Sequence, residues 1–325
     1  MPVPPHPDPT RRRLLKALAA AVTAAPAISH ASGRDHLWRF PLSDRGARLV
    51  GDNHIALAGR DETLHDVARR FDVGYWDILL ANPDVDFWLP GTGTPVIIPR
   101  RYILPDAPRR GIVINAAELR LYYYPAIANG THEVITHPIG IGRQDWGTPA
   151  GATTVTEKIP QPAWYPPASI RAEAAAKGES LPRVVPPGAD NPLGDYALIL
   201  DLPGYLIHGT NRPAGVGMRV SHGCVRLYPE DIATLFPRVP RGTPVRIVNQ
   251  PIKHTWHAGQ LWAEAHPLPA TEDYTSVDLR FGDAERRRLA RALTSVAIGH
   301  GQLPDRGRLQ TLLERPSGVP TAITR

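Results

Sequence analysis

The spacing of apolar residues between positions 53 and 99 predicts a small domain of two helices and two strands. One helix face collects apolar residues at i, i+3, i+4 and i+7, namely Leu64, Val67, Ala68 and Phe71. Thr63 and Asp66 form a start that resembles a capping box, and a second short helix is indicated over 75–81. An apolar run over 95–99 predicts a closing strand. Strand, helix, helix and strand in such a short segment are typical of a very small α+β domain.

Between 108 and 248 the pattern changes to alternation of apolar and polar residues with many β-branched side chains, which indicates strands. The segments with this pattern are 111–115, 119–124, 133–139, 153–156, 197–200, 205–207 and 245–248. Two helices interrupt them, one over 170–177 and one that begins at Pro229. Because few helices alternate with the strands, a doubly wound α/β sheet is disfavoured. We expect a mainly β domain with few short helices.

The C-terminal extension, 249–325, has weaker patterns. The segment 260–266 predicts one more strand, and 284–296 predicts a basic amphipathic helix that turns one apolar face inward. From Gly301 onward, the polarity and the Pro and Gly content predict a partly disordered tail. We assign no chemistry to this extension.

The first 31 residues have the parts of a signal peptide. Arg11 to Lys16 supply a basic start, an Ala-rich apolar run follows to Ile28, and Ser29-His30-Ala31 is a small-x-small cleavage pattern. The apolar run is short of the roughly 20 residues that span a bilayer, so we expect cleavage and no permanent membrane span. The arginine pair before Leu-Leu-Lys resembles a twin-arginine signal, and a plain secretory signal stays open. The leader carries no cysteine, which excludes lipidation at a lipobox.

The charge of the chain gives no sign of a nucleic-acid partner. The formal net charge is +6, and the leader holds four basic residues against one acidic residue, so the mature chain is only mildly basic. Its basic groups are short, such as Arg100-Arg101 and Arg286-Arg287-Arg288. A nucleic-acid surface is expected to be a basic stripe with interleaved aromatics, so we expect no nucleic-acid binding.

The single cysteine of the chain, Cys224, lies in the segment Ser-His-Gly-Cys-Val-Arg at 221–226. Exported proteins usually pair their cysteines, so an odd one is an accident, an intermolecular bridge or a reactive thiol. Gly223 lets backbone amides approach a bound oxygen, as an oxyanion site demands. His208 follows a predicted strand and can approach the thiol head-on, as a hydrogen bond of about 3 Å requires. A thiol with an imidazole partner forms a thiolate, which is the nucleophile.

Two motifs carry a family resemblance. His-Gly-Thr-Asn at 208–211 and Arg-Val-Ser-His-Gly-Cys-Val-Arg-Leu at 219–227 resemble the active-site signature of the L,D-transpeptidases, which have a YkuD-type catalytic domain. Further similar segments are I-V-I-N-A-A-E-L-R-L-Y-Y-Y-P, P-I-G-I-G-R-x-x-W-G-T-P-A-G, D-N-P-L-G-x-Y-A-L and P-E-D-I-A-x-L-F. The similarity covers essentially all of 108–248 and implies a YkuD-like β-sandwich that needs no cofactor.

The small domain over 53–99 resembles a LysM module, a binder of N-acetylglucosamine-containing glycans. The similar segments are E-T-L-H-D-V-A-R-R-F-D-V, L-A-N-P and L-P-G-T-G-T-P-V-I-I-P. A spacer that no longer binds glycan is the open alternative. An N-terminal LysM-like unit also occurs in the transpeptidases that attach Braun-type outer-membrane lipoprotein to peptidoglycan, and this subgroup resembles the chain most. The resemblance therefore implies a periplasmic enzyme.

The resemblance implies an acyl transfer on peptidoglycan. Cys224 would attack the carbonyl of a diaminopimelate residue in a tetrapeptide stem, release the terminal D-alanine and hold the stem as a thioester. An amine then takes the stem, either a lysine of an outer-membrane lipoprotein, which we favour, or a second diaminopimelate. Two other functions stay open. One is a cell-wall cysteine hydrolase that uses the same residues, and the other is a catalytically dead glycan-binding scaffold.

The resemblance also implies roles for individual residues. His208 matches the base, with the backbone carbonyl of Gly209 fixing its ring. His222 would support the surroundings of the thiol, and the amides of Gly223 and Cys224 would bind the oxyanion. Substrate contacts are expected from Arg226, Arg219, Ser221 and Asn211. Of these, an arginine guanidinium has the right shape to meet a substrate carboxylate.

Simpler explanations stay open for three of these side chains. His208 could be a strand-end histidine packed against Tyr205, and His222 could be a purely structural hydrogen-bonder. Arg226 could only pair with Glu230 across the start of the predicted helix. We expect no metal, because nothing nearby supplies the further protein ligand that zinc would need beside the thiol and the two imidazoles.

Overall fold

The computed structural model describes residues 38–43, 46–126, 132–143, 147–266 and 281–325. The signal peptide expected over 1–31 lies outside the described residues. All described residues belong to one compact unit, 35–325. Within the described ranges, we find no helix that combines the length and the apolar character needed to cross a membrane.

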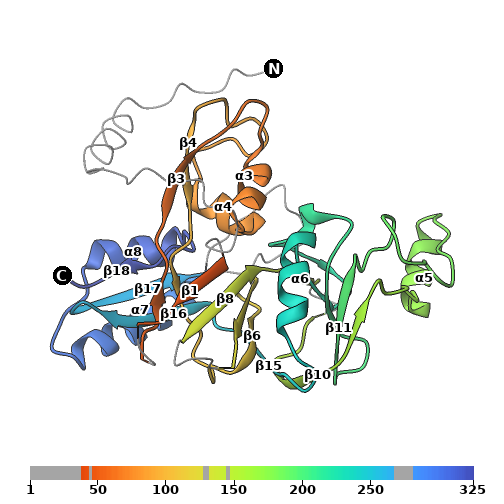
Figure 1. Cartoon of the computed structure of the whole chain (residues 1–325). Helices are drawn as coiled ribbons and strands as arrows, with labels where there is room; N and C mark the ends of the chain where they lie inside the picture. The colour runs from red at the N-terminus through yellow and green to blue at the C-terminus, as the bar shows by residue number, and fades with distance from the viewer. Residues whose placement is uncertain (1–37, 44–45, 127–131, 144–146, 267–280) are drawn as a thin grey trace. The chain divides into compact units, whose positions relative to one another are not determined.

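A nine-stranded sheet forms the segment predicted to be mainly β (Figure 1). In spatial order its strands are β1 (Arg39–Pro41), β8 (Glu133–Pro138), β7 (Arg120–Tyr124), β6 (Gly111–Asn115), β15 (Pro244–Val248), β10 (Gly151–Pro160), β11 (Tyr196–Leu200), β12 (Leu206–His208) and β14 (Val225–Arg226). The pairs β6 with β15 and β12 with β14 are parallel, and the other neighbours are antiparallel. Each strand predicted between 108 and 248 is present.

The long strand β10 turns the sheet. Its first half, from Gly151 to Thr154, pairs with β15, and its second half, from Val155 to Pro160, pairs with β11. The register shifts between Val155 and Glu157, and such an irregularity bends a strand. A mainly β domain is present, but a bent strand carries one continuous, curled sheet round the core.

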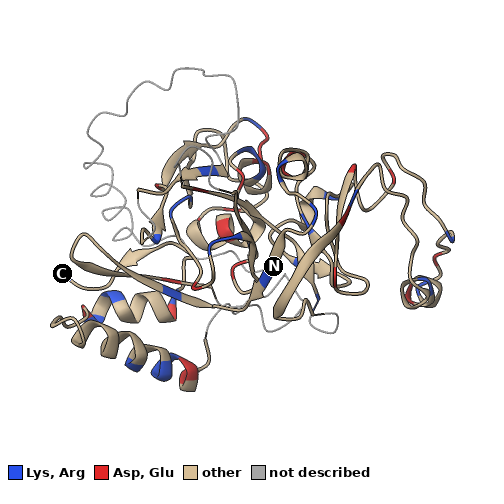
Figure 2. Ribbon diagram, turned by 60° about the horizontal axis from the view of Figure 1, so that its bottom comes forward, with Lys and Arg blue, Asp and Glu red and all other residues tan. Residues whose placement is uncertain are grey.

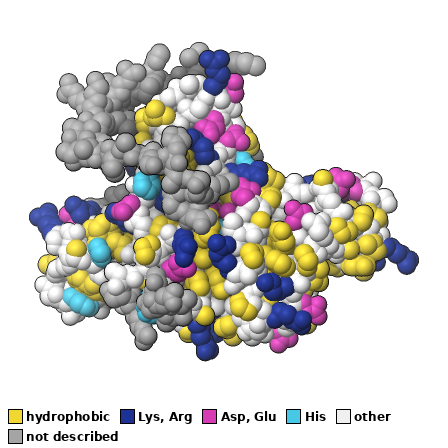
Figure 3. All heavy atoms as spheres, in the orientation of Figure 1, with side chains coloured by type: hydrophobic (Ala, Val, Ile, Leu, Met, Phe, Trp, Pro, Cys, Tyr) yellow, Lys and Arg dark blue, Asp and Glu magenta, His cyan; other side chains and the backbone are white. Residues whose placement is uncertain are grey.

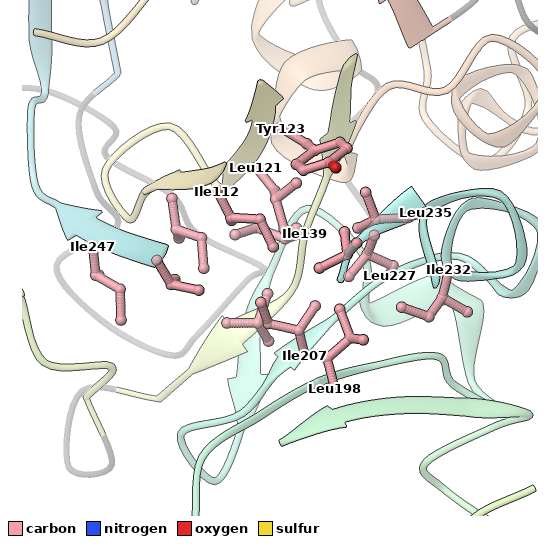
Figure 4. Close-up of a cluster of buried hydrophobic side chains, with 14 of the residues drawn as sticks. Ile112, Leu121, Tyr123, Ile139, Leu198, Ile207, Leu227, Ile232, Leu235 and Ile247 are labelled. Atoms are coloured by element: carbon pink, nitrogen blue, oxygen red, sulfur yellow. The ribbon is translucent and has the colours of Figure 1, made fainter. Parts of the chain in front are cut away.

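One large apolar core holds this sheet together (Figure 4). Its side chains come from β6, β7, β11, β12 and β15 and from helix α6 (Pro229–Leu235). Ile112, Leu121, Leu198, Ile207 and Leu227 have none of their surface exposed. Burial of one such side chain contributes about 1.5–3 kcal/mol, so the core fixes β12 and the start of α6 against each other.

Residues 53–99 form the predicted small domain. It contains β3 (His54–Leu57), α3 (Leu64–Arg70), α4 (Tyr75–Ala81) and β4 (Pro95–Ile98), with the two strands antiparallel. Thr63 caps α3, and Asp66 closes the capping box as the sequence predicts. The helices cover one side of the strand pair and bury their own apolar cluster, which includes Leu64, Val67 and Ile98.

Short elements connect these parts. They are β2 (Leu49–Val50) paired with β5 (Tyr102–Ile103), β9 (Ile141–Gly142) paired with β13 (Arg219–Ser221), helix α5 (Ala168–Ala176) and the 3-10 turns η2 (Pro213–Gly215) and η3 (Phe236–Arg238). Charged residues of both signs are interspersed over the elements (Figure 2). On the face seen in Figure 3, hydrophobic side chains lie among polar and charged ones.

The C-terminal extension is a folded unit. Strands β16 (Ile252–His257), β17 (Gln260–Ala265) and β18 (Thr321–Ala322) form an antiparallel sheet, and α7 (Asp283–Ile298) and α8 (Arg306–Glu314) share an apolar cluster with it. The prediction of a partly disordered tail from Gly301 onward is wrong for α8 and β18. Leu309, Leu312 and Leu313 lie at i, i+3 and i+4 on one buried helix face, which the polar average composition concealed.

A buried cluster of charges joins this extension to the nine-stranded sheet. The Nζ atom of Lys253 lies 2.6 Å from a carboxylate oxygen of Glu118 and 2.5 Å from one of Glu264, and all three side chains are 1% exposed. Glu264 also accepts a hydrogen bond from the amide of Ile103 at 3.0 Å. Burial by itself would raise the pKa of Glu118, but the positive charge of Lys253 lowers it below its ordinary value. One cation therefore forms ion pairs with carboxylates from two parts of the chain.

Substitution of Lys253 by Met is expected to destabilise the fold by about 3–5 kcal/mol, because two buried carboxylates lose their counter-ion. Urea denaturation at neutral pH measures the change in the free energy of unfolding. The exposed Lys177→Met serves as the control, with an expected change of about 0.5 kcal/mol or less. Equal stabilities of the two variants would show that the cluster does not hold the extension in place.

Candidate active site

The strands β12 and β14 lie side by side and run parallel. Ile207 pairs with Val225, and His208 pairs with Arg226. Ile207 and Val225 belong to the apolar core. Because successive side chains of a strand point to opposite faces, the neighbours of these two residues point away from the core. His208, Arg226 and Cys224 therefore share one face at the edge of the sheet.

His208 is a buried histidine with a defined proton position. Its side chain and backbone are 3% exposed, and its Nδ1 lies 2.6 Å from the backbone oxygen of Gly209. A carbonyl oxygen only accepts, so Nδ1 carries the proton and the neutral ring keeps a lone pair on Nε2. Burial, together with the charge of Arg226, lowers the pKa of His208 to about 3. The ring is therefore a neutral base at neutral pH, held by the carbonyl that the sequence analysis named.

The thiol of Cys224 is partly buried, and within the described residues its hydrogen bonds do not include His208. Its Sγ donates to the backbone oxygen of Gly204 at 3.4 Å. Burial raises the pKa of Cys224, and the amide of Leu206 and the charge of Arg226 offset this only in part. The sequence analysis expected a thiolate paired head-on with an imidazolium. In this structure the thiol instead bonds to Gly204, and both groups favour their neutral forms. Both groups are withdrawn from water, which disfavours their charged forms.

The thiol loop, residues 221–224, is held by hydrogen bonds from several segments. The hydroxyl of Ser221 donates to the carbonyl of Cys224 at 2.6 Å, and the hydroxyl of Thr148 donates to the carbonyl of Gly223 at 2.8 Å. Gly223 has a φ of 105°, in the region that favours glycine, so the chain turns sharply before the thiol. Among the described residues, the amides of Gly223 and Cys224 have no hydrogen-bond partner.

The guanidinium of Arg226 is a cation with no acidic partner in the described part of the chain. Its Nε is buried without a hydrogen-bond partner, and burial lowers the pKa of the side chain. Glu230, the alternative partner, is instead bound by Arg69 of α3 through two contacts of 2.9 Å. A cation that is partly shielded from water and has no counter-ion is costly, so this position favours a negatively charged group of a ligand.

The other residues expected to bind substrate have different surroundings. Ser221 is 1% exposed and its hydroxyl closes the thiol loop, so the expectation of a substrate contact is corrected to a structural one. Arg219 is partly buried, and its Nε donates to the backbone of Gly142 at 3.4 Å. Asn211 is exposed at the surface of the connection between β12 and β13.

His222 contacts a residue that the sequence analysis did not find. Its Nε2 lies 2.8 Å from a carboxylate oxygen of Glu173, in helix α5. The same carboxylate accepts two hydrogen bonds from Arg143, at 3.1 and 3.2 Å, and one from Lys177 at 2.7 Å. Arg143 and Lys177, with His222, hold the pKa of Glu173 well below its usual range. The Ala-rich and Glu-rich pattern of α5 predicts only a helix and gives no signal for these contacts.

Residues 53–99 contact both flanks of the segment that carries the thiol. The amide of Tyr75 donates to the carbonyl of Val216 at 3.2 Å, and the hydroxyl of Tyr228 donates to the carbonyl of Val73 at 3.3 Å. Gly217 has a φ of 81°, and a Cβ there would lie 2.1 Å from the Tyr75 amide nitrogen. This close approach therefore requires glycine.

Comparison with known proteins identifies the family. Residues 109–247 match the family model described as the L,D-transpeptidase catalytic domain, YkuD. The protein named "Probable L,D-transpeptidase YcfS" of Escherichia coli K12 is 48% identical over 240 residues, which cover 72% of each chain. This chain belongs to the L,D-transpeptidase family.

Two further comparisons concern the length and the fold of the transpeptidase. "Probable L,D-transpeptidase ErfK/SrfK" of Escherichia coli K12 is 42% identical over 292 residues, which cover 88% of this chain and 90% of that protein. The crystal structure of L,D-transpeptidase 3 from Mycobacterium tuberculosis is 18% identical, with a TM-score of 0.31, over 47% of this chain and 66% of that one. The expected enzyme class is confirmed by the sequence relatives.

Two groups of buried side chains in the described part of the transpeptidase have metal-ligand types, and neither includes a residue of the site. In the first, Nδ1 of His137 lies 3.2 Å from Asp72 and 3.6 Å from Asp231. Burial and the neighbouring Asp72 raise the pKa of Asp231 well above its ordinary value. In the second, the ammonium of Lys253 already lies between Glu118 and Glu264.

Alkylation of the transpeptidase by iodoacetamide reports on Cys224 alone, because the chain has no other cysteine. A raised pKa leaves little thiolate at neutral pH, so the rate is expected to rise only above the ordinary thiol value of about 8.5. Arg226→Gln removes a positive charge near the thiol and should move the inflection to still higher pH. The exposed Arg287→Gln is the control. A wild-type inflection near pH 6 would instead show that an ion pair with His208 forms in the resting enzyme.

Proposed function

We propose that the chain is a peptidoglycan L,D-transpeptidase in which Cys224 is the nucleophile and His208 is the base. The observation that carries this proposal is the shared sheet face of Cys224, His208 and Arg226, next to a thiol loop with two free amides. Nucleophile, base, oxyanion donors and a cation for the substrate are the parts that acyl transfer through a thioester needs.

The first half of the reaction is acylation. A rotation of the thiol away from Gly204 lets Nε2 of His208 take its proton while Sγ attacks the carbonyl of diaminopimelate in a tetrapeptide stem. The amides of Gly223 and Cys224 donate to the oxyanion. The imidazolium then gives the proton to the departing amine of D-alanine, and a thioester between Cys224 and the stem remains. Proton transfer occurs during attack, in agreement with the neutral resting forms of both groups.

The second half transfers the stem. An acceptor amine attacks the thioester, its proton goes to Nε2 of His208, and the thiolate leaves and regains that proton. The guanidinium of Arg226 binds a carboxylate of the stem throughout, because its Nε atom is buried and the described residues offer it no counter-ion. Water in place of the amine would make the same residues a hydrolase.

The small domain supports a location on the cell wall. We propose that residues 53–99 are a LysM-like module that holds the enzyme on glycan strands, and that the leader exports the chain to the periplasm. The strand, helix, helix and strand order supports the first part, as do Trp88 and Leu89, which are 66% and 81% exposed in the loop before β4. For the acceptor amine, we favour a lysine of an outer-membrane lipoprotein.

A carbapenem is expected to acylate Cys224, because its strained carbonyl mimics the attacked stem. Intact-mass analysis should show one adduct on the wild-type protein and none on Cys224→Ser. Incubation with disaccharide tetrapeptide and an added amine should then yield the stem joined to that amine, with loss of D-alanine. An equal mass increase in Cys224→Ser would reject the nucleophile, and release of free tripeptide stems alone would identify a hydrolase.

The acceptor is tested in cells that lack the gene. If the acceptor is a lipoprotein, wall-bound lipoprotein should fall while the amount of stems joined between two diaminopimelates stays unchanged. Digestion of purified sacculi and mass spectrometry of the fragments measure both. Restoration by the wild-type gene, but not by the Cys224→Ser gene, controls for indirect effects. The opposite pattern of losses would assign the enzyme to stem-to-stem cross-linking.

A further inference from the structure

Helix α5 is tied to the thiol loop through one carboxylate. Glu173 accepts from His222 of that loop at 2.8 Å and from both terminal nitrogens of Arg143. Arg143 is itself joined to the loop, because its amide donates to the carbonyl of Ser221 at 2.9 Å. Glu173 therefore connects three segments that are far apart in sequence: α5, the end of β9 and the thiol loop.

The segment that carries α5 is an excursion of the chain between β10 and β11, drawn in Figure 1. The buried side chain of Asn191 closes its neck by donating to the carbonyls of Pro162, Val185 and Pro186, at 2.8 to 3.2 Å. An isolated antiparallel β-bridge between Trp164 and Val185 also joins the two ends of the excursion. Asn191 and this bridge hold the excursion together from within, whereas Glu173 joins it to the thiol loop.

The charge of Glu173 decides where His222 keeps a proton. Three cationic or proton-donating side chains surround the carboxylate, namely Arg143, Lys177 and His222. An ionised carboxylate only accepts hydrogen bonds. The Nε2 atom of His222 must then carry the proton that it shares with Glu173. This contact restrains the ring orientation and favours the Nε2–H form of a residue two positions before Cys224.

We propose that Glu173 is a positioning residue of the transfer reaction, which holds His222 as the Nε2–H form and fixes the α5 excursion against the thiol loop. The proposal rests on the proposed role of Cys224 as the nucleophile. In this proposal the α5 excursion forms one wall of the substrate site. The ion-paired carboxylate of Glu173 sets the distance between this wall and the thiol. Displacement of a positioned group by about 1 Å lowers reaction rates by about a hundredfold in enzymes.

Loss of Glu173 is expected to change two rates in different directions, the alkylation of Cys224 and its acylation by the stem. This difference distinguishes a positioning role from a purely electrostatic one. Removal of a negative charge near the thiol favours the thiolate, so the iodoacetamide rate at a given pH should stay equal or increase. Acylation by the tetrapeptide stem should decrease, because the wall and the thiol loop lose their common anchor. A residue with only a general structural role would lower both rates together.

The experiment uses the full-length protein with Glu173→Ala, the isosteric Glu173→Gln and the conservative Glu173→Asp. The exposed Glu179→Gln, from the same excursion, is the matched control. Glu173→Ala is expected to reduce kcat/KM for disaccharide tetrapeptide about tenfold or more, with a higher KM. Iodoacetamide alkylation should not slow, Glu173→Asp should recover part of the loss, and Glu179→Gln should behave as wild type. Circular dichroism verifies that each variant is folded.

A second readout is independent of activity. In protein labelled with ¹⁵N-histidine, the imidazole nitrogens of His222, assigned by comparison with His222→Gln, should report the Nε2–H form in the wild type. That signature should be lost in Glu173→Ala and kept in Glu179→Gln. An unchanged signature in Glu173→Ala, or an unchanged kcat/KM, overturns the proposal. If wild-type protein forms no thioester at Cys224, the proposed function fails instead, while the imidazole spectra still decide whether Glu173 holds His222.

Discussion

The parallel pairing of β12 with β14 is the constraint on which the site depends. Parallel neighbours cannot be joined by a tight turn, so the chain must leave the sheet after His208 and return before Val225. The connection folds over the edge of the sheet and forms η2, β13 and the thiol loop. Two buried residues, Ile207 and Val225, then set the register, and the alternation of the strands brings base, thiol and cation to one face.

Charge balance favours a negatively charged ligand at that face. Acidic side chains around the site are already bound to cations: Glu173 to Arg143 and Lys177, and Glu230 to Arg69. Arg226 has no such partner within the described residues and is partly shielded from water. A carboxylate beside this guanidinium would supply a counter-ion, as the proposed substrate contact requires. Burial likewise favours the neutral forms of the thiol and the imidazole, because it lowers the pKa of His208 and raises that of Cys224.

The small domain bonds to the segments that flank the thiol loop, and the C-terminal extension bonds to the nine-stranded sheet. The turn between α3 and α4 bonds to Val216 before the thiol and to Tyr228 after it. Lys253 of the C-terminal extension forms an ion pair with Glu118, which lies between β6 and β7 of the sheet. A change in either flanking part is therefore transmitted to the sheet through hydrogen-bonded contacts rather than through a linker.

The sequence by itself determined the elements and the contiguous part of the site. Alternation and helical spacing predicted the longer strands and helices between 53 and 248, because local periodicity is set by side-chain burial. The short strands β5, β9, β13 and β14 were not predicted, because two or three residues are too few to show a period. The motifs around His208 and Cys224 singled out the thiol, one histidine and Arg226. Average composition failed for α8, where three leucines on one face outweigh a polar surrounding.

Only the tertiary structure decided which groups touch. Glu173 and His222 are hydrogen-bonded although they lie 49 positions apart in sequence. Arg69 and Glu230 are hydrogen-bonded although they lie 161 positions apart. The thiol bonds to Gly204 rather than to His208, and Ser221 faces inward. Such contacts depend on the register of strands and on the burial of charges, which are properties of the whole fold. A linear motif records which residues are present but not the distances or the dielectric surroundings that set their protonation.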